Sequence, residues 1–199
     1  MTLIEMDRPM RDGRRKDSAL RDWVRALEAT APIAGQPRRI LLDAVGDIAQ
    51  IHGDAPALIG EHDTLTYRAL VERSRRYARW ALGQKLGKGQ TVCLVMPNRP
   101  DYMAAWLGIT AVGGVVSFVN TQLRGPSLTH CIDIVAPAHA IVAAECVEQF
   151  RSAQLTARPK IWSYGGSDYL PIDRELERFS SSPLTDAERR ATSDRKSVV

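Results

Sequence analysis

The stretch that decides the expected fold is "TVCLVMPNRPDYMAAWLGITAVGGVVSFV", Thr91–Val119. It begins with a short apolar run of the length of a buried strand. Asn98 is then predicted to cap a helix over Arg99–Val112, with Pro100 in the first turn and Asp101 near the positive helix end. The β-branched and aromatic residues "VVSFV" predict a second strand. A strand, a helix and a strand in this order form a parallel βαβ unit.

A glycine pair, Gly113 and Gly114, separates this helix from the second strand. The helix must stop abruptly there. Glycine adopts a positive φ without a Cβ clash, so one of the two is predicted to have that conformation. Both flanking segments are apolar, as expected for elements covered on two sides. We therefore predict that Trp106 and Leu107 are buried, and that the second strand, 115–119, is buried as well.

The run from Tyr102 to Leu123 contains no charged residue, which leaves a second interpretation open. An apolar run of about eighteen residues is a candidate for a transmembrane span. The glycine pair interrupts this run, however, and its two halves favour different structures. Met, Ala, Leu and Trp favour a helix, whereas Val and Phe favour a strand. We prefer a buried helix followed by a buried strand, and keep a single-span membrane protein as an alternative.

The rest of the chain also alternates between strands and helices. Apolar strands that alternate with amphipathic helices give a parallel sheet covered on both faces. The expected fold class is therefore α/β, three-layer, with a mostly parallel sheet and helices on both faces. The other predicted elements are a helix over 18–29 capped by Ser18, a helix over 38–53 closed by Gly53, a hairpin over 57–67, a helix over 67–84 capped by Thr66, a helix over 126–135, a strand over 140–145, a short helix ending at Phe150, a final strand over 159–165 and a helical turn over 173–179.

Composition divides the chain into three parts. Residues 1–35 are expected to form an N-terminal arm and an amphipathic helix, because their apolar residues recur at helical spacing. Residues 36–180 hold the alternating strands and helices. Residues 181–199 turn to serine, proline and charge, and are expected to form an irregular tail.

The end of that tail, "DRKSVV" (194–199), fits no helix or strand pattern. The codons GAT CGG AAG AGC GTC GTG followed by TAG would encode it. This string resembles the start of a widely used sequencing adapter. The expectation is that 194–199 are foreign and stand outside the fold. An ordinary charged C-terminus is the alternative.

The composition is that of an ordinary globular protein: 199 residues, 44% hydrophobic and 25% charged, with a net charge of +4. The basic stretch Arg8–Lys16 is interrupted by aspartate and lacks aromatic residues, so a nucleic-acid partner is not expected. The three cysteines are widely spaced and form no CxxC pair, which disfavours zinc and fits reduced thiols in a cytoplasmic protein. The N-terminal residues lack the apolar segment of a secretory signal.

Three glycine-containing segments are candidates for a phosphate loop. Such a loop follows a strand and opens a helix, so that backbone N–H groups face the anion. Both "LGKGQT" (86–91) and "AVGGVV" (111–116) instead follow a helix and precede a strand. The segment "SYGGSD" (163–168) follows a strand, but it lacks GxGxxG spacing and a strong helix after it, so it is a weak candidate for an anion-binding turn. A nicotinamide-dependent dehydrogenase is therefore disfavoured.

A histidine and a cysteine stand side by side at His130 and Cys131. Neighbours on a helix point about 100° apart, so the imidazole would not reach the sulfur as a catalytic dyad requires. Cys131 shares the spacing of a buried helix face with Leu128 and Val135, and His130 flanks that face. The other histidines lack metal-ligand spacing. The sequence therefore predicts no catalytic, cofactor-binding or metal-binding residue in this chain.

Three segments within 57–145 together resemble the N-terminal part of the adenylate-forming enzymes, the acyl-CoA synthetase superfamily. The segment "TLTYRAL" (64–70) is similar to a strand-to-helix junction of that family. The segment "LGKGQTVCLVMPNRPDYMAAWLGITAVGGVV" (86–116) is similar to its turn, strand, capped helix and second strand. The segment "VNTQLRGPSLTHCI" (119–132) resembles the fatty-acid transport protein branch, the long- and very-long-chain acyl-CoA synthetases, in which an Asn-Thr, a Leu-Arg and a His-Cys pair recur. Asn120 is expected to hold the turn after the strand.

The resemblance implies an ATP-dependent fatty acyl-CoA ligase that uses ATP, Mg²⁺ and CoA. In that family the carboxylate of the acid attacks the α-phosphate of ATP, giving an acyl-adenylate and pyrophosphate, and the CoA thiol then displaces AMP. The phosphate-holding loop Ser/Thr-Gly-Thr-Gly-x-Pro-Lys does not occur in this sequence. We therefore expect residues 36–180 to form an incomplete N-terminal adenylation (AMP-binding) domain. The chain by itself is expected to bind none of these cofactors and to be inactive.

Two interpretations from other classes stay open beside this one. The chain could be a non-catalytic α/β binding or interaction module, or the single-span membrane protein considered above. For the ligase, a fatty acid is the expected substrate of the complete enzyme. A cytoplasmic location is expected, with peripheral contact at a membrane surface compatible with a fatty substrate.

Overall fold

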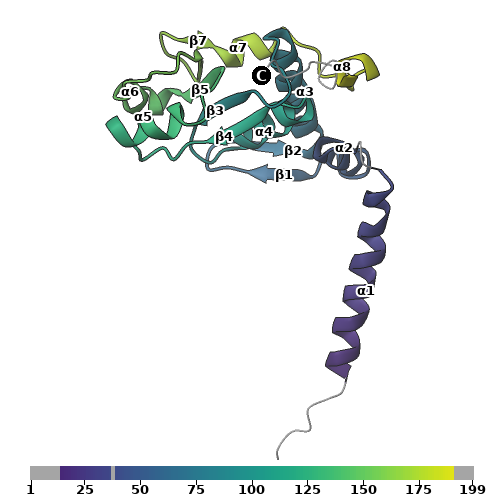
Figure 1. Cartoon of the computed structure of the whole chain (residues 1–199). Helices are drawn as coiled ribbons and strands as arrows, with labels where there is room; N and C mark the ends of the chain where they lie inside the picture. Colours follow the sequence, from purple (N-terminus) through teal and green to yellow (C-terminus); the bar gives the residue numbers. More distant parts are fainter. Residues whose placement is uncertain (1–13, 37–38, 191–199) are drawn as a thin grey trace, which may run out of the picture. The chain divides into compact units, whose positions relative to one another are not determined.

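The computed structural model describes residues 14–36 and 39–190. The chain divides into two units, Met1–Arg39 and Ile40–Val199, and each is described by itself. The first unit contains helix α1 (Arg14–Ala34) (Figure 1). This helix begins four residues before Ser18, so the predicted cap at Ser18 is wrong. Arginine and lysine are good helix formers, which favours the additional first turn.

The second unit begins with a helix, a hairpin and a longer helix, as predicted. The hairpin is antiparallel. The hydroxyl of Thr66 caps the longer helix by accepting a hydrogen bond from the backbone N–H of Ala69 at 3.2 Å. Gly53 follows the last residue of the first helix of this unit. These elements are α2 (Leu41–His52), β1 (Pro56–Ile59), β2 (Thr64–Thr66) and α3 (Tyr67–Gly83).

Five parallel strands form the main sheet, in the order β4-β3-β5-β6-β7. They are β3 (Thr91–Val95), β4 (Val115–Phe118), β5 (His139–Ala143), β6 (Lys160–Tyr164) and β7 (Leu170–Pro171). From β3 the chain moves to one side to form β4, and then returns to the other side of β3 to form β5. This is the order of a doubly wound sheet. The predicted parallel α/β sheet is confirmed.

Helices cover both faces of the sheet. The right-handed connection of parallel strands places α4, which joins β3 to β4, on one face, and α5 and α6, which follow in the opposite direction, on the other (Figure 1). Helix α3 packs along α4. The elements are α4 (Pro100–Ala111), α5 (Gly125–Asp133), the 3₁₀ turn η1 (Ala144–Cys146), α6 (Val147–Arg151), α7 (Ile172–Leu176) and α8 (Asp186–Arg190).

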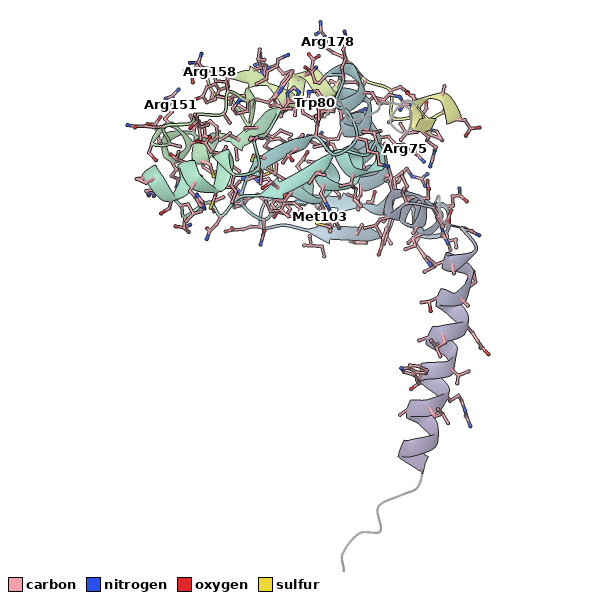
Figure 2. The ribbon with its side chains drawn as sticks, in the orientation of Figure 1. Arg75, Trp80, Met103, Arg151, Arg158 and Arg178 are labelled. Carbon is pink, nitrogen blue, oxygen red and sulfur yellow. The ribbon has the colours of Figure 1, made fainter. Side chains whose placement is uncertain are left out.

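Helices α3 and α4 approach each other closely at Gly108. A Cβ on Gly108 would lie 2.2 Å from the carbonyl oxygen of Ser74 and 2.6 Å from Cβ of Tyr77. Only glycine allows the two backbones this separation. Trp80 of α3, labelled in Figure 2, is fully buried, and its ring meets the ring of Trp162 edge-on with the centroids 5.4 Å apart.

Helix α4 begins differently from the prediction. Its N-cap is Arg99, which is extended (φ −151°), and no side chain caps the helix, so the predicted cap at Asn98 is wrong. Pro100 lies in the first turn, as predicted, but it is the first helical residue, where the prediction began the helix at Arg99. Asp101 follows it, and its carboxylate is buried among side chains of other elements instead of lying free at the helix end.

The glycine pair has the predicted role. Gly113 has a φ of +83°, and the chain turns there from α4 into β4. The run from Tyr102 to Leu123 is therefore part of a helix, a turn and a strand, and the single-span interpretation is wrong. Across 14–36 and 39–190, none of the helices has the length and apolar character that a bilayer crossing requires.

Strand β4 lies at the edge of the sheet, and the burial predicted for 115–119 is wrong for 115–118 and correct for Val119. Val115 and Phe118 are each 46% exposed, because β4 has a neighbouring strand, β3, on one side only.

Burial also differs between two adjacent residues of α4. Leu107 is buried, as predicted, whereas Trp106 is only half-buried and meets the exposed ring of Phe118.

The C-terminal part of the described chain is more ordered than the sequence indicated. Strand β6 was expected to be the last strand, but β7 pairs with it in parallel. Helix α8 lies within the segment 181–199, where an irregular tail was expected, so that expectation is wrong for 186–190. The segment 194–199, predicted to be foreign, lies outside the described residues.

Candidate functional site

Doubly wound sheets bind ligands in the crevice outside the carboxyl ends of their strands, where the strand order reverses. In this sheet the reversal lies between β3 and β5. The residues that follow β3 are Met96–Arg99, those that follow β4 are Val119–Thr121, and Glu145 follows β5. The fold therefore predicts that a ligand binds at this edge of the sheet.

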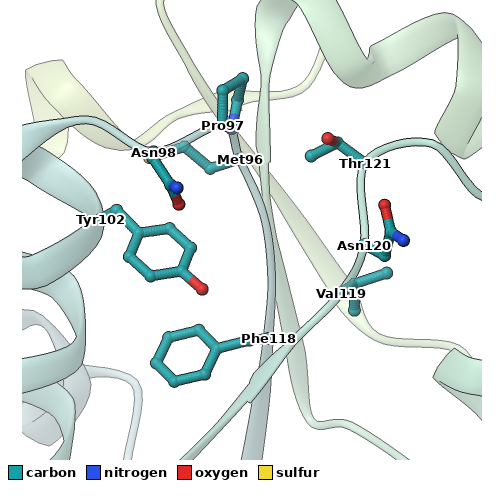
Figure 3. A pocket seen from close by; sticks show the side chains of 8 residues that line it. All are labelled: Met96, Pro97, Asn98, Tyr102, Phe118, Val119, Asn120 and Thr121. Atoms are coloured by element: carbon teal, nitrogen blue, oxygen red, sulfur yellow. The ribbon is translucent and has the colours of Figure 1, made fainter.

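A pocket of about 450 Å³ lies at the carboxyl ends of β3 and β4 (Figure 3). One wall is aromatic: the rings of Tyr102 and Phe118 stack with their centroids 4.8 Å apart and an interplanar angle of 18°. Ligand pockets commonly combine such apolar walls with a few polar groups. The lining residues are Met96, Pro97, Asn98, Tyr102, Phe118, Val119, Asn120 and Thr121.

The polar side-chain groups that line this pocket are the amides of Asn98 and Asn120 and the hydroxyls of Tyr102 and Thr121. Asn120 holds the turn after β4, as predicted, because its Oδ1 accepts a hydrogen bond from the backbone N–H of Gln122 at 2.9 Å. Its NH₂ group remains available as a donor. Asn98 also lines the pocket, and Figure 3 shows both amides, Tyr102 and Thr121 among the lining side chains. The pocket can therefore offer hydrogen bonds beside an aromatic surface.

An ion pair spans the crevice next to this pocket. The guanidinium of Arg99, after β3, pairs with the carboxylate of Glu145, after β5. The same guanidinium lies over the ring of Tyr164, 5.4 Å from its centroid. Arginine commonly makes such cation–π contacts. The ion pair therefore lies across the point where the strand order reverses. Its guanidinium contacts the ring of Tyr164 at the end of β6.

Behind the crevice, one buried carboxylate joins three elements. Asp101 Oδ1 accepts hydrogen bonds from Arg73 Nε at 2.8 Å and from the Tyr77 hydroxyl at 3.1 Å, and Oδ2 accepts one from the Tyr164 hydroxyl at 2.8 Å. Burial and the nearby Asp101 charge raise the pKa of Tyr77 and of Tyr164 well above the ordinary value. Both tyrosines are therefore neutral donors, and the cluster fixes α4 against α3 and β6.

The adjacent pair His130 and Cys131 does not form a catalytic dyad. His130 is exposed on α5, and Cys131, expected in the core, is half-buried. The buried positions of α5 are Leu128 and Ile132. Burial raises the pKa of the other nearby thiol, Cys93, to about 11, so it is protonated at neutral pH.

The glycine-containing segments have structural roles. Gly89, in the loop between α3 and β3, has a φ of +80°. Gly165 and Gly166 both have a positive φ in the turn after β6, where the carboxylate of Asp168 pairs with Arg151 and would oppose an anion. In the described part of the chain, no three His, Cys, Asp or Glu side chains are grouped so that they could hold a metal ion.

Comparison with known proteins identifies the family. The model of the family described as AMP-binding enzyme matches residues 47–194. The chain therefore belongs to the AMP-binding enzyme family. The resemblance to acyl-CoA synthetases inferred from the sequence is confirmed.

Similar proteins with curated descriptions include long-chain fatty acid transport protein 6 of Homo sapiens, 34% identical over 131 residues, which cover 64% of this chain and 21% of that protein. The long-chain-fatty-acid–CoA ligase of Salmonella typhimurium is 32% identical over 126 residues, which cover 61% of this chain and 22% of that protein. The chain thus spans about a fifth of the length of these relatives. The fold is shared with a benzoate CoA ligase from Burkholderia xenovorans, with a TM-score of 0.62 and 20% identity over 70% of this chain and 28% of that chain.

Sequence reasoning singled out Asn98 only as a helix cap and Asn120 only as a turn residue, and it missed the pocket and the Asp101 cluster. Both depend on residues that only folding brings together. One signal was present: Asp101 is the only charged residue of α4, "PDYMAAWLGITA", and a lone charge in an apolar helix requires a buried partner.

Proposed function

We propose that this chain forms the front part of the acid-activating domain of an ATP-dependent fatty acyl-CoA ligase. The family match over 47–194, which includes the sheet and the pocket, carries the proposal. Relatives described as a fatty acid transport protein and as a long-chain-fatty-acid–CoA ligase support a fatty acid as the substrate of the complete enzyme. In such an enzyme the fatty acid would react with ATP, in the presence of Mg²⁺, to give the acyl-adenylate, from which CoA displaces AMP.

The described residues fit the phosphates of ATP poorly. The positive side chain that follows β3 in the crevice, Arg99, is already paired with Glu145. The start of α4, which would otherwise attract an anion, carries the carboxylate of Asp101. Stabilisation of the charge on the reacting phosphate is usually the largest single contribution to this kind of catalysis. We therefore propose that other parts of the complete enzyme hold the phosphates, and that this chain alone forms no acyl-adenylate.

A chimera tests the proposal. Residues 40–190 would replace the aligned stretch of the Salmonella typhimurium ligase, and oleoyl-CoA and pyrophosphate would be measured with oleate, ATP, Mg²⁺ and CoA. We expect product from the chimera, and none above background from the isolated 199-residue chain. Product from the isolated chain would refute the proposed inactivity. A chimera that unfolds cooperatively but is inactive would favour a non-catalytic binding module.

The matched control in the chimera is Cys131→Ser. The side chain is half-buried and lacks a catalytic partner, so we expect oleoyl-CoA formation within about twofold of the unsubstituted chimera. Loss of product from a normally folded Cys131→Ser chimera would restore the nucleophile interpretation.

A further inference from the structure

Helix α1 exposes an apolar stripe along one side. Within the first unit, described by itself, Leu20, Trp23, Val24 and Leu27 are between 43% and 65% exposed. At about 100° per residue these four side chains fall within an arc of roughly 100°, which defines the α1 stripe. Exposed apolar surface of this kind marks a site of interaction with another molecule or with a membrane.

The polar residue nearest the stripe uses its donor within the helix. The hydroxyl of Thr30 donates to the carbonyl oxygens of Ala26 and Leu27, at 2.9 and 3.2 Å. Its hydrogen is therefore not available to water or to a polar partner. The hydroxyl of Thr30 therefore keeps a hydrogen-bond acceptor when this side of the helix contacts an apolar medium.

Positive charge gathers near the start of the helix. The segment Arg8–Lys16, which runs into the first turn of α1, contains five basic residues and one aspartate. Arg21 and Arg25 follow outside the stripe together with Asp22 and Glu28, so the excess of positive charge lies in the segment Arg8–Lys16. A basic segment joined to an apolar helix face is complementary to an anionic lipid surface.

We propose that α1 binds the surface of an anionic membrane, with the α1 stripe inserted at the boundary between headgroups and acyl chains. The inference rests on the proposed function, because a fatty substrate partitions into bilayers and an enzyme held there meets it directly. Trp23 fits this position, since tryptophan is enriched at membrane–water interfaces. The helix lies on the membrane and does not cross it, in keeping with its charged face.

Pairing of the stripe with a second copy of α1 is less favoured. A coiled coil is indicated by an apolar heptad pattern sustained over three or four repeats. The stripe from Leu20 to Leu27 spans a single heptad, and the next positions are Thr30, Ala31 and Ala34. These small or polar side chains bury little surface against a partner helix.

The test uses the purified 199-residue chain and sedimentation with vesicles of phosphatidylcholine that contain about one part in four phosphatidylglycerol. We expect the chain to sediment with these vesicles. The double variant Leu20→Gln/Leu27→Gln should lower the partition coefficient at least about tenfold, since two buried side chains are lost. The matched control is Ile33→Gln, which makes the same kind of change at an exposed residue on another side of α1. It should keep binding within about twofold.

Tryptophan fluorescence provides a second readout. The emission should shift to shorter wavelength with the vesicles, and the shift should disappear in Trp23→Phe while sedimentation remains. About 1 M NaCl, where the Debye length is about 3 Å, should weaken binding, because it screens the attraction between the basic segment and the anionic lipid. Failure to sediment, or equal loss in the Ile33→Gln control, would overturn the proposal. The proposal would also be overturned if the chain does not bind vesicles and instead forms a concentration-dependent dimer that Leu20→Gln/Leu27→Gln abolishes.

The vesicle assay contains no ATP, CoA or fatty acid, so its outcome is independent of the ligase proposal. An inactive chimera with normal vesicle binding of the 199-residue chain would refute the proposed function and leave the membrane-binding property of α1. An active chimera, combined with a 199-residue chain that does not sediment, would support the ligase proposal and refute membrane binding by α1.

Discussion

The hydroxyl of Tyr164, in the last residue of β6, donates a hydrogen bond of 2.8 Å to Oδ2 of Asp101, the second residue of α4. Arg73 reaches the other oxygen of the same carboxylate from α3. One buried side chain therefore connects two helices and the sheet directly behind the candidate site. Its position makes Asp101 the principal polar connection between these layers.

Asp101→Ala should strongly destabilise the fold. The substitution leaves the guanidinium of Arg73, 22% exposed, without its buried partner, and removes the acceptor of two tyrosines. Breaking a buried ion pair costs about 3–5 kcal/mol. Urea denaturation measures the loss in the free energy of unfolding. The control is Asp54→Ala, which removes an exposed pair with Arg68 and should cost about 0–1 kcal/mol. Similar losses in the two variants would contradict this account.

The stability of the chain should fall at mildly acidic pH because of His139. This imidazole is buried, its Nδ1 accepts a hydrogen bond of 3.2 Å from Trp162 Nε1, and both burial and the Lys160 charge lower its pKa. Below about pH 6.5 the unfolded histidine binds a proton that the folded one does not, so stability falls as the pH drops toward the lowered folded pKa.

For one proton the slope is at most about 1.4 kcal/mol per pH unit. The measurement is the free energy of unfolding between about pH 7 and pH 5. His139→Gln keeps an acceptor for Trp162 and should flatten the profile. His62→Gln, at a side chain that is 87% exposed, should leave it unchanged. A profile of equal slope in the wild type and in His139→Gln would exclude this histidine as the cause.

Arg79 should control the order of the segment 180–188. Its guanidinium donates to the carbonyl oxygens of Ser180, Ser182 and Pro183, at 2.7 to 3.1 Å, and pairs with Glu188 at 2.7 Å. Arg79→Lys keeps the charge but loses the planar fork that serves these acceptors together.

Amide hydrogen exchange should therefore become at least about tenfold faster across 180–188, while the sheet keeps its protection. Arg76→Lys is the control, because Arg76 bonds to Glu177, just before the segment. Unchanged exchange in the Arg79→Lys protein would mean that the segment is held by other contacts.

Two glycine substitutions should have opposite effects. Gly113→Ala introduces a Cβ at a φ of +83° and should cost about 1–2 kcal/mol. Gly46→Ala lies within α2, with open space around the new methyl group, and should be neutral or stabilise by up to about 1 kcal/mol. Thermal unfolding of the two variants checks the contrast. A stable Gly113→Ala protein would show that the turn can relax.

Local features of the fold were predictable because they depend on neighbours in the sequence. The Thr66 cap bonds three residues ahead, and the turn at Gly113 follows from the absence of a Cβ. The alternation of apolar strands and helices likewise predicted the parallel sheet. The cap at Asn98 was wrong although Asn is a good capping residue, because the path of the chain from β3 into α4 places Arg99 at the cap.

The sequence by itself determined the fold class and the family, because apolar periodicity and short motifs are local properties of the chain. The tertiary structure alone decided that β4 is an exposed edge, that Tyr102 and Phe118 form one wall of a pocket, and that Asp101 joins Arg73 and Tyr164 across 28 and 63 residues. Helical spacing cannot indicate which distant side chain meets a buried carboxylate, since the order of the strands sets those distances. The physical reason is that burial makes a charge costly without a partner, and only the packing of α3, α4 and β6 supplies the partners.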